Sequence, residues 1–294
     1  MKKTETGIFV LFILQILCLG TAHSADSPSA TFKEELSKQE EIFRSKEGRV
    51  PEGYTIDRTL EDYAQTLSSD FDSALANLGP KDRWLDIGAG KGNAILDYYT
   101  PDYDLNHLQG HARRGEKAKA VAISVEDRRT PLWHQTAASL VPSQIQYFFE
   151  KRVRDYSLGE LGRFQVITDL LGGFSYTDEL SVFLEKVLGF LELKGTFYTL
   201  LQDVNSQEGT NRPFYANSPY LTEISNADDS EVKVCVWLKR ITCVEVSCEL
   251  KAQWKPPIEV YRIHKVCDEV SVPALVRMHY QAGTPPERRY RLRN

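Results

Sequence analysis

Hydrophobic and polar positions in the middle of the chain follow two alternating periods. Short apolar runs end at polar or glycine-rich positions, and most are followed by a segment whose apolar residues recur every three or four positions. Short apolar runs are typical of buried strands, and the longer spacing is typical of amphipathic helices. Strands that alternate with helices predict an α/β fold, with a mostly parallel sheet between two layers of helices.

The pattern places seven strands, of which the last two form a closing antiparallel pair with Pro256 and Pro257 in its turn. The expected strands are Trp84–Ile87, Lys119–Val125, Ile145–Phe149, Phe164–Thr168, Thr196–Leu201, Cys243–Leu250 and Ile258–Val266. The expected helices are Ser29–Arg49, Leu60–Leu78, Asn93–Tyr99, Leu132–Leu140, Leu180–Leu191 and Glu231–Arg240. Gly79-Pro80 ends the second helix, and Lys194-Gly195 is expected to be a turn.

The composition allows a large folded core and argues against one class of partner. The chain has 294 residues, of which 41% are hydrophobic. A net charge of -5 argues against a protein that coats nucleic acid, so no nucleic-acid partner is expected. Several arginines gather near the C-terminus, where a solvated, frayed end is expected: Arg288, Arg289, Arg291 and Arg293.

The first 25 residues have the three parts of a secretory signal peptide. A basic start at Lys2 and Lys3 precedes an apolar core over Ile8–Leu19, and small residues around Ala25 follow. The core is shorter than the roughly 20 residues of a membrane-spanning helix. The sequence therefore predicts export to the periplasm or the medium, with a membrane anchor formed by an uncleaved signal as the alternative.

Four cysteines remain beyond the expected signal peptide, all in the last quarter of the chain: Cys235, Cys243, Cys248 and Cys267. An even, clustered set in an oxidising compartment indicates one or two disulfides, with three ways to pair all four. Buried thiols are the alternative. The set contains no C-x-x-C pair, so no metal site is expected.

A glycine-rich turn follows the first expected strand. Asp86 ends an apolar run, and glycines stand at 88, 90 and 92, before the helix that starts at Asn93. A strand, a tight glycine turn and a helix let bare backbone approach a nucleotide-like ligand. Asn93 stands where a dinucleotide fingerprint needs Gly or Ala, and Gly92 stands where a phosphate loop needs Ser or Thr.

This acid followed by G-x-G-x-G resembles the first motif of the class I S-adenosylmethionine-dependent methyltransferases, and the likeness covers about Trp84 to Val266. It implies a Rossmann-like seven-stranded sheet with one antiparallel strand, and S-adenosylmethionine as the cofactor. The reaction implied is a direct displacement in which an acceptor of unknown identity attacks the sulfonium methyl group. Positioning can supply much of such catalysis, and no catalytic residue stands out.

The resemblance assigns cofactor-binding roles to eight positions. The turn contributes Asp86, Gly88, Ala89, Gly90 and Gly92. Glu126 follows the second expected strand and would bind the ribose hydroxyls. Asp127, the next residue, would take this role if the strand ended one position later. Asp155 would read the adenine amino group, and Asp169 would border the methyl group. The alternatives are a solvated turn acid at 126, an ion pair at 155 and a turn or capping residue at 169.

The expected organisation has four parts: a signal peptide over 1–25, an N-terminal helical cap over 26–80, a methyltransferase-like domain over 81–270 and a C-terminal appendage over 271–294. Tyr54 or Tyr63 of the cap could reach a ligand, although core aromatics are the commoner case. The polar stretch 202–229 is long enough for a substrate lid. Thr284-Pro285-Pro286 argues against regular structure in the appendage.

Two other functions compete with methyl transfer. An aminopropyl transferase shares the fold and uses a decarboxylated relative of the cofactor, and here Asp169 with Asp178 would have to bind the amine. The second competing function is that of an exported binding or interaction protein that retains the fold without catalysis. Export favours this last reading, because S-adenosylmethionine is made in the cytosol.

Overall fold

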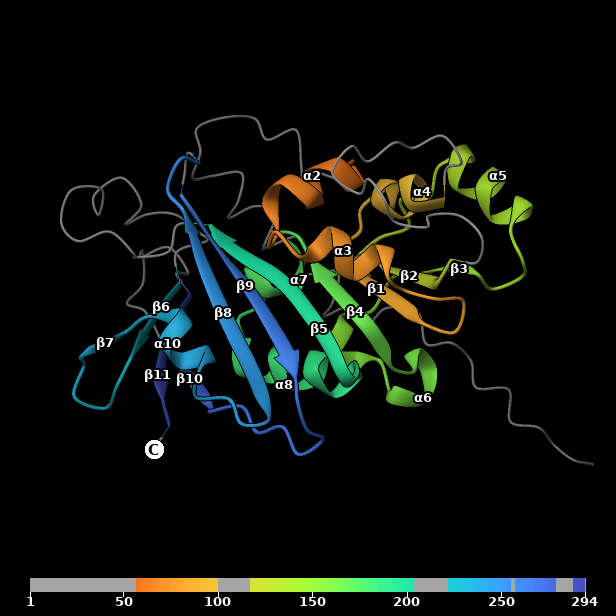
Figure 1. The fold of residues 1–294 in the computed structure, drawn as a ribbon. Helices are drawn as coiled ribbons and strands as arrows, with labels where there is room; N and C mark the ends of the chain where they lie inside the picture. Colours follow the sequence, from red (N-terminus) through yellow and green to blue (C-terminus); the bar gives the residue numbers. More distant parts are fainter. Residues whose placement is uncertain (1–56, 100–116, 203–221, 255–256, 279–287, 294) are drawn as a thin grey trace, which may run out of the picture.

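The computed structural model describes residues 57–99, 117–202, 222–254, 257–278 and 288–293 (Figure 1). Three sequence predictions lie outside the described residues: the signal peptide, the helix over 29–49 and the position of Tyr54. Most of the expected lid over 202–229 does so too. Within the described part of the chain, no helix combines the length and hydrophobicity that a membrane span requires.

A seven-stranded sheet runs through the molecule in the order β3-β2-β1-β4-β5-β9-β8. Neighbouring strands are parallel except at β9, which is antiparallel to β5 and β8. This confirms the predicted Rossmann-like sheet with one antiparallel strand. The strands are β1 Arg83–Ile87, β2 Lys119–Ile123, β3 Ile145–Phe148, β4 Phe164–Asp169, β5 Leu191–Gln202, β8 Val244–Lys251 and β9 Ile258–Lys265.

Side chains of β1 to β5 and of β9 alternate between two hydrophobic clusters, one on each face of the sheet, and β8 contributes to one of them. On β1, Leu85 and Ile87 belong to one cluster and Trp84 to the other. The Trp84 face is covered by α2 Leu60–Thr66, α3 Phe71–Ala76, α4 Asn93–Tyr99 and α5 Pro131–Ser139. The Ile87 face is covered by the 3-10 helix η2 Val153–Asp155, α6 Leu158–Leu161, α7 Gly173–Tyr176 and α8 Leu180–Phe190.

A second, four-stranded sheet has the order β10-β11-β6-β7. Its strands are β6 Thr222–Ser225, β7 Glu231–Val232, β10 Leu275–Arg277 and β11 Arg288–Leu292. The expectation of a frayed arginine end was therefore wrong, whereas Thr284-Pro285-Pro286 lies outside the described residues. Residues 288, 290 and 292 alternate inward and are buried, and Tyr290 and Leu292 belong to the same cluster as Ile87. The backbone of β11 also pairs with β6, about 65 positions earlier in the chain.

Three local predictions differ from the structure. The helix expected over Leu60–Leu78 is two helices, because the chain turns at 68–70, where the Ser68 hydroxyl donates to the Asp70 carboxylate. The helix expected over Glu231–Arg240 is a strand, β7, followed by the short helix α10 Val234–Leu238. The turn at Lys194-Gly195 lies inside β5, where Lys194 takes a φ of 67°.

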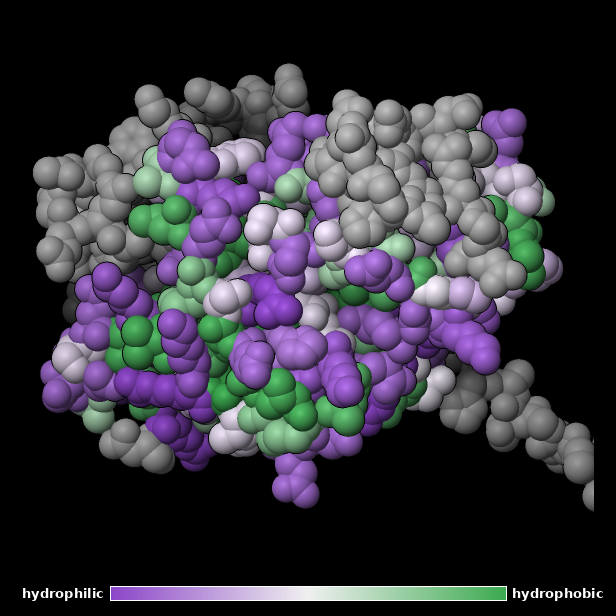
Figure 2. All heavy atoms as spheres, in the orientation of Figure 1, coloured by the Kyte–Doolittle hydropathy of each residue, from purple (hydrophilic) through white to green (hydrophobic). Residues whose placement is uncertain are grey.

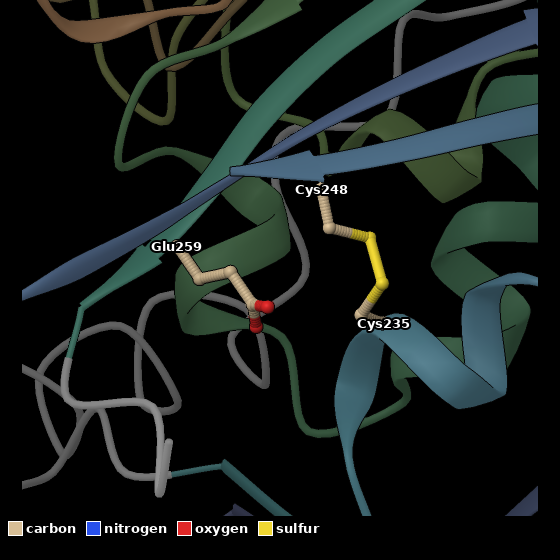
Figure 3. A group of neighbouring side chains, drawn as sticks. All are labelled: Cys235, Cys248 and Glu259. Carbon is tan, nitrogen blue, oxygen red and sulfur yellow. A yellow bond between two sulfur atoms is a disulfide. The ribbon is translucent and has the colours of Figure 1, made fainter. Parts of the chain in front are cut away.

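Two disulfides fasten the edge of the large sheet. Cys235–Cys248 joins α10 to β8, and Cys243–Cys267 joins the residues that precede β8 and follow β9. Glu259 lies beside the first disulfide, and the ligand atoms of these three residues lie within 4.8 Å of one another (Figure 3). Both sulfurs are already bonded to each other, so neither offers a thiolate to a metal.

The face of the molecule that carries β8 mixes hydrophilic and hydrophobic side chains, and hydrophobic ones gather over α8 and around α10 (Figure 2). Among the exposed apolar residues are Val182 of α8 and Val236 of α10. Such scattered exposure is ordinary for a soluble surface and marks no site by itself.

Candidate functional site

The glycine turn lies at the carboxyl end of β1, where it passes close to a second loop. Gly88, Gly90 and Gly92 all have positive φ. A Cβ atom added to Gly88 would lie 2.6 Å from the Cα of Gly172, in the loop that follows β4. A Cβ atom on Gly172 would in turn lie 2.5 Å from the carbonyl oxygen of Ile87. Glycine at both positions is what allows the two backbones to touch.

Asp169 shapes the loop that follows β4. Its fully buried carboxylate accepts the backbone N–H groups of Gly172 (2.8 Å) and Phe174 (2.9 Å). Burial raises the pKa of Asp169 to about 7, although these two hydrogen bonds act to lower it. Leu171, which lies between Asp169 and Gly172, takes a φ of 55°, which is unusual for a bulky side chain. Asp169 therefore holds the turn that follows β4.

Side chains of β11 contact the carbonyl oxygens of the same loop and of the residue that follows α7. The Arg288 guanidinium donates to the carbonyl oxygens of Phe174 (2.7 Å) and Thr177 (3.0 Å). The Tyr290 hydroxyl also donates to Thr177 (3.1 Å). These contacts fix α7, which leads out of the loop. This role could not be predicted from the sequence, because β11 is remote from β4 along the chain.

Asp86 faces away from the glycine loop, on the Trp84 face of the sheet. Its fully buried carboxylate accepts the hydroxyl groups of Tyr63 (2.8 Å) and Thr168 (2.8 Å). Burial raises the pKa of Asp86 to about 7. The carboxylate thus fastens α2 to β1 and β4. Tyr63 is correspondingly a buried core residue, and it lines neither of the two cavities described below.

Asp86→Asn should gain stability relative to the parent as the pH rises. The pKa of Asp86 is about 7 in the folded protein and near 3.8 when unperturbed, so the folded state holds the proton more tightly. The contribution of this group to stability is therefore present below pH 4 and is lost as the pH rises to 7. Asn cannot ionise, so the relative gain between pH 5 and pH 8 should be about 2 kcal/mol.

Urea unfolding at the two pH values measures this gain. Asp127→Asn is the control: Arg129 holds the pKa of Asp127 below its usual value, so this group stays ionised between pH 5 and pH 8, and its substitution should have an effect that does not change with pH in this range. A difference between Asp86→Asn and the parent that did not change with pH would show that Asp86 is not buried as a titrating carboxyl group.

A cavity opens beside the glycine turn, on the Ile87 face of the sheet. Its volume is about 1050 Å³ when the open mouth is included. Its apolar walls include Ile87, Ile123, Val153 and Phe183, and its glycine backbone comes from residues 88, 90, 172 and 173. Apolar walls with a few polar groups and bare backbone are the usual composition of a small-molecule site.

The predicted turn residues differ in their relation to this cavity. Gly88 and Gly90 line it. Gly92 instead packs against Trp133, whose ring atoms would lie 2.4 Å from an added Cβ, and Ala89 is buried outside the lining. Asp86 points to the opposite face because side chains alternate along a strand.

The residue at the tip of β2 that lines the cavity is Ser124, and Glu126 is not part of the lining. β2 ends at Ile123, so Ser124 follows directly and is buried. Glu126 is exposed and forms an ion pair with Arg128 (2.5 Å). Asp127 is likewise paired with Arg129 (2.7 Å). The structure thus brings neither acid to the cavity wall.

Asp155 lies in η2 and also stays outside the lining, although its neighbours line the cavity. Its carboxylate accepts the backbone N–H of Arg152 (3.2 Å), and half of its side chain is exposed. The described structure therefore gives Asp155 a role in shaping the turn after β3.

A second cavity adjoins the first on the side of α2. Arg58 and Leu171 line both. The second cavity is further lined by Leu200 and Gln202 of β5, by Ile258 of β9 and by the partly exposed Trp254. Sequence reasoning missed Arg58 and Trp254, because neither lies in a motif and each comes from outside the alternating core.

Comparison with known proteins adds a likeness in fold. No protein-family profile matches the sequence, and no curated protein matches it. The chain is similar to the solved structure of 1,6-didemethyltoxoflavin-N1-methyltransferase from Burkholderia thailandensis, with bound 1,6-didemethyltoxoflavin and S-adenosylhomocysteine. The identity is 15%, the TM-score is 0.46, and the match covers 82% of this chain and 93% of that chain.

Two further solved structures are methyltransferases of other substrates. N-methyltransferase NodS from Bradyrhizobium japonicum, in complex with S-adenosylhomocysteine, has 11% identity and a TM-score of 0.43, over 77% of this chain and 98% of that one. Magnesium protoporphyrin IX methyltransferase from Synechocystis, with bound S-adenosylmethionine, has 10% identity and a TM-score of 0.42, over 83% and 100%. The likeness concerns the fold alone.

Proposed function

We propose that this protein is an S-adenosylmethionine-dependent methyltransferase. The observation that carries the proposal is the contact between Gly88 and Gly172, which leaves bare backbone at the edge of a cavity beyond the carboxyl ends of β1, β2 and β4. Ligands of open α/β sheets bind at this edge. The sequence motif and the topology of the sheet agree with that location.

The residues of the cavity fit such a cofactor in part. The glycine backbone and the apolar walls suit a nucleoside, and Ser124 offers one hydroxyl group at the tip of β2, where an acid was expected. When bound, the cofactor supplies an electrophilic methyl group. The chain itself then binds and orients the two reactants. Gly88, Gly90 and Gly172 leave room for the cofactor in the first cavity. Leu171 and Arg58 lie between this cavity and the second one, which we assign to the acceptor.

Catalysis on this proposal is mainly positional. An acceptor atom held near attack distance in the second cavity gains most of its advantage from orientation. The two buried carboxylates, Asp86 and Asp169, are each committed to hydrogen bonds of the scaffold. Neither is therefore assigned as a general base.

Calorimetric titration with S-adenosylmethionine and with S-adenosylhomocysteine tests the proposal. We expect both to bind with one site per chain. If neither compound binds, the proposal is overturned and an exported binding protein that has lost the cofactor is favoured.

Ser124→Ala and Glu126→Ala, measured in parallel, show which position contacts the ribose of the bound cofactor. We expect the larger loss of affinity in Ser124→Ala.

The aminopropyl transferase alternative loses its proposed amine site. Asp169 is enclosed by the backbone of its own loop, and Asp178 is paired with Arg277 (2.7 Å). The two carboxylates therefore do not form an acidic pair open to an amine.

We also propose that the protein is exported. The signal-like N-terminus and the two disulfides support this, because disulfides persist in oxidising compartments. Mass spectrometry of protein purified from its native host should find an N-terminus at or near Ala25 or Asp26, and no thiol open to alkylation before reduction. An intact Met1 peptide from a cytosolic fraction, with four free thiols, would overturn this proposal and remove the main argument for a non-catalytic protein.

A further inference from the structure

The first cavity has an unusual balance of charge. Five of its described lining residues are cationic, and none is Asp or Glu: Arg58, Arg128, Lys151, Arg152 and Arg154. Two loops supply four of these cations, because β2 and β3 are parallel neighbours and their carboxyl ends meet at one edge of the sheet. The cations therefore gather over the same end of the cavity.

For two of these cations, Arg128 and Arg154, the paired carboxylate stands further out toward solvent. Arg128 pairs with Glu126, and their side chains are 27% and 46% exposed. Arg154 pairs with Glu179, and these are 28% and 50% exposed. Exposed ion pairs are weak and screened, so a ligand anion can compete for the arginine at little cost. The arginines, being the more buried partners, give the cavity a positive potential that the outer carboxylates only partly cancel.

We propose that this cavity binds a small molecule that carries a phosphate or carboxylate group between the loops that follow β2 and β3. Arg128 and Arg154 are the principal contacts, since guanidinium groups hold both kinds of anion through paired hydrogen bonds. S-adenosylmethionine brings a single carboxylate, a positive sulfonium and a positive amino group, so the five cations suit a more anionic ligand. This anion site lies in the first cavity and is distinct from the acceptor site, which the proposed function places in the second cavity.

The chain contains a matched control for this proposal. Arg128 and Arg129 are adjacent, are similarly exposed at 27% and 30%, and each pairs with an acid two residues earlier. Arg128 lines the cavity, whereas Arg129 is outside the lining and lies over the rings of Tyr147 and Phe149. Substituting one or the other removes the same charge at almost the same place in the sequence.

The experiment is a calorimetric titration of the full protein with pyrophosphate and, separately, with citrate, each with and without saturating S-adenosylhomocysteine. Pyrophosphate or citrate should bind the parent, and added chloride salt should weaken the binding. Arg128→Gln and Arg154→Gln should each lower the affinity about tenfold. Arg129→Gln should leave it within about twofold, and thermal unfolding should show that all three variants are folded.

Each outcome has a distinct meaning. Binding of pyrophosphate alone identifies a phosphate ligand, and binding of citrate alone identifies a carboxylate ligand. If neither binds, or if Arg129→Gln weakens binding as much as Arg128→Gln, the anion site is overturned. If pyrophosphate binds while S-adenosylhomocysteine does not, the anion site stands and the proposed methyl transfer fails.

Discussion

Gly88→Ala is expected to lower the affinity for S-adenosylhomocysteine by about one to two decades, since backbone strain of about 1–3 kcal/mol at the cavity edge corresponds to a loss of that size. The added Cβ would lie 2.6 Å from the Cα of Gly172, and backbone on both sides leaves no flexible side chain to move. The positive φ of 76° adds strain for any residue with a Cβ. The two loops must separate, and the cavity edge moves with them.

Gly189→Ala is the matched control for this substitution. Gly189 lies in α8, and nothing lies within 4 Å of a Cβ added there. The control should keep the parent's affinity and gain about 0.5–1 kcal/mol of stability, as expected for Ala in place of Gly inside a helix. Titration calorimetry and urea unfolding measure both quantities. Parental affinity in Gly88→Ala would mean that the turn serves only the fold.

Asp169→Ala is expected to destabilise the protein by about 2–6 kcal/mol, because it leaves two buried N–H groups without an acceptor at about 1–3 kcal/mol each. Those groups belong to Gly172 and Phe174, so the loop that borders both cavities loses its anchor. The strained backbone at Leu171 then has less to hold it. Affinity for S-adenosylhomocysteine should fall with stability.

Asp169→Asn separates the hydrogen bonds from the charge. Asn keeps one acceptor oxygen and loses the second, so its destabilisation should be smaller than that of Asp169→Ala in urea unfolding at pH 7. Equal losses in the two variants would show that side-chain volume, rather than acceptance of the two N–H groups, is what the loop requires.

The alternating pattern of the sequence was enough to predict the large sheet and the place of the glycine turn. The reason is local: each apolar run is bounded by turn residues, and the antiparallel closing pair follows directly along the chain. Helix limits were less accurate where a tertiary contact decides them. The chain turns at Asp70 because that carboxylate also contacts Arg262 of β9 (2.6 Å) and Tyr198 of β5 (3.2 Å).

The candidate site was harder to predict than the fold, since two acids depended on the exact end or face of a strand. Glu126 fell outside the cavity lining because β2 ends at Ile123, three residues earlier. Asp86 fell on the opposite face, which strict alternation from Ile87 would have indicated. Arg58 lines both cavities and Trp254 lines the second, and each comes from a segment that carries no recognisable motif.

The position of β11 has a consequence for the order in which the chain can fold. This strand lies between β6 and β10, and its Arg288 and Tyr290 support the loop that borders the cavities. These two residues are translated more than a hundred positions after the loop that they support. The loop therefore has only its own contacts until the later segment has been made. Contacts of such long sequence separation form slowly, so the cavity edge is expected to be among the late parts of the molecule to fold.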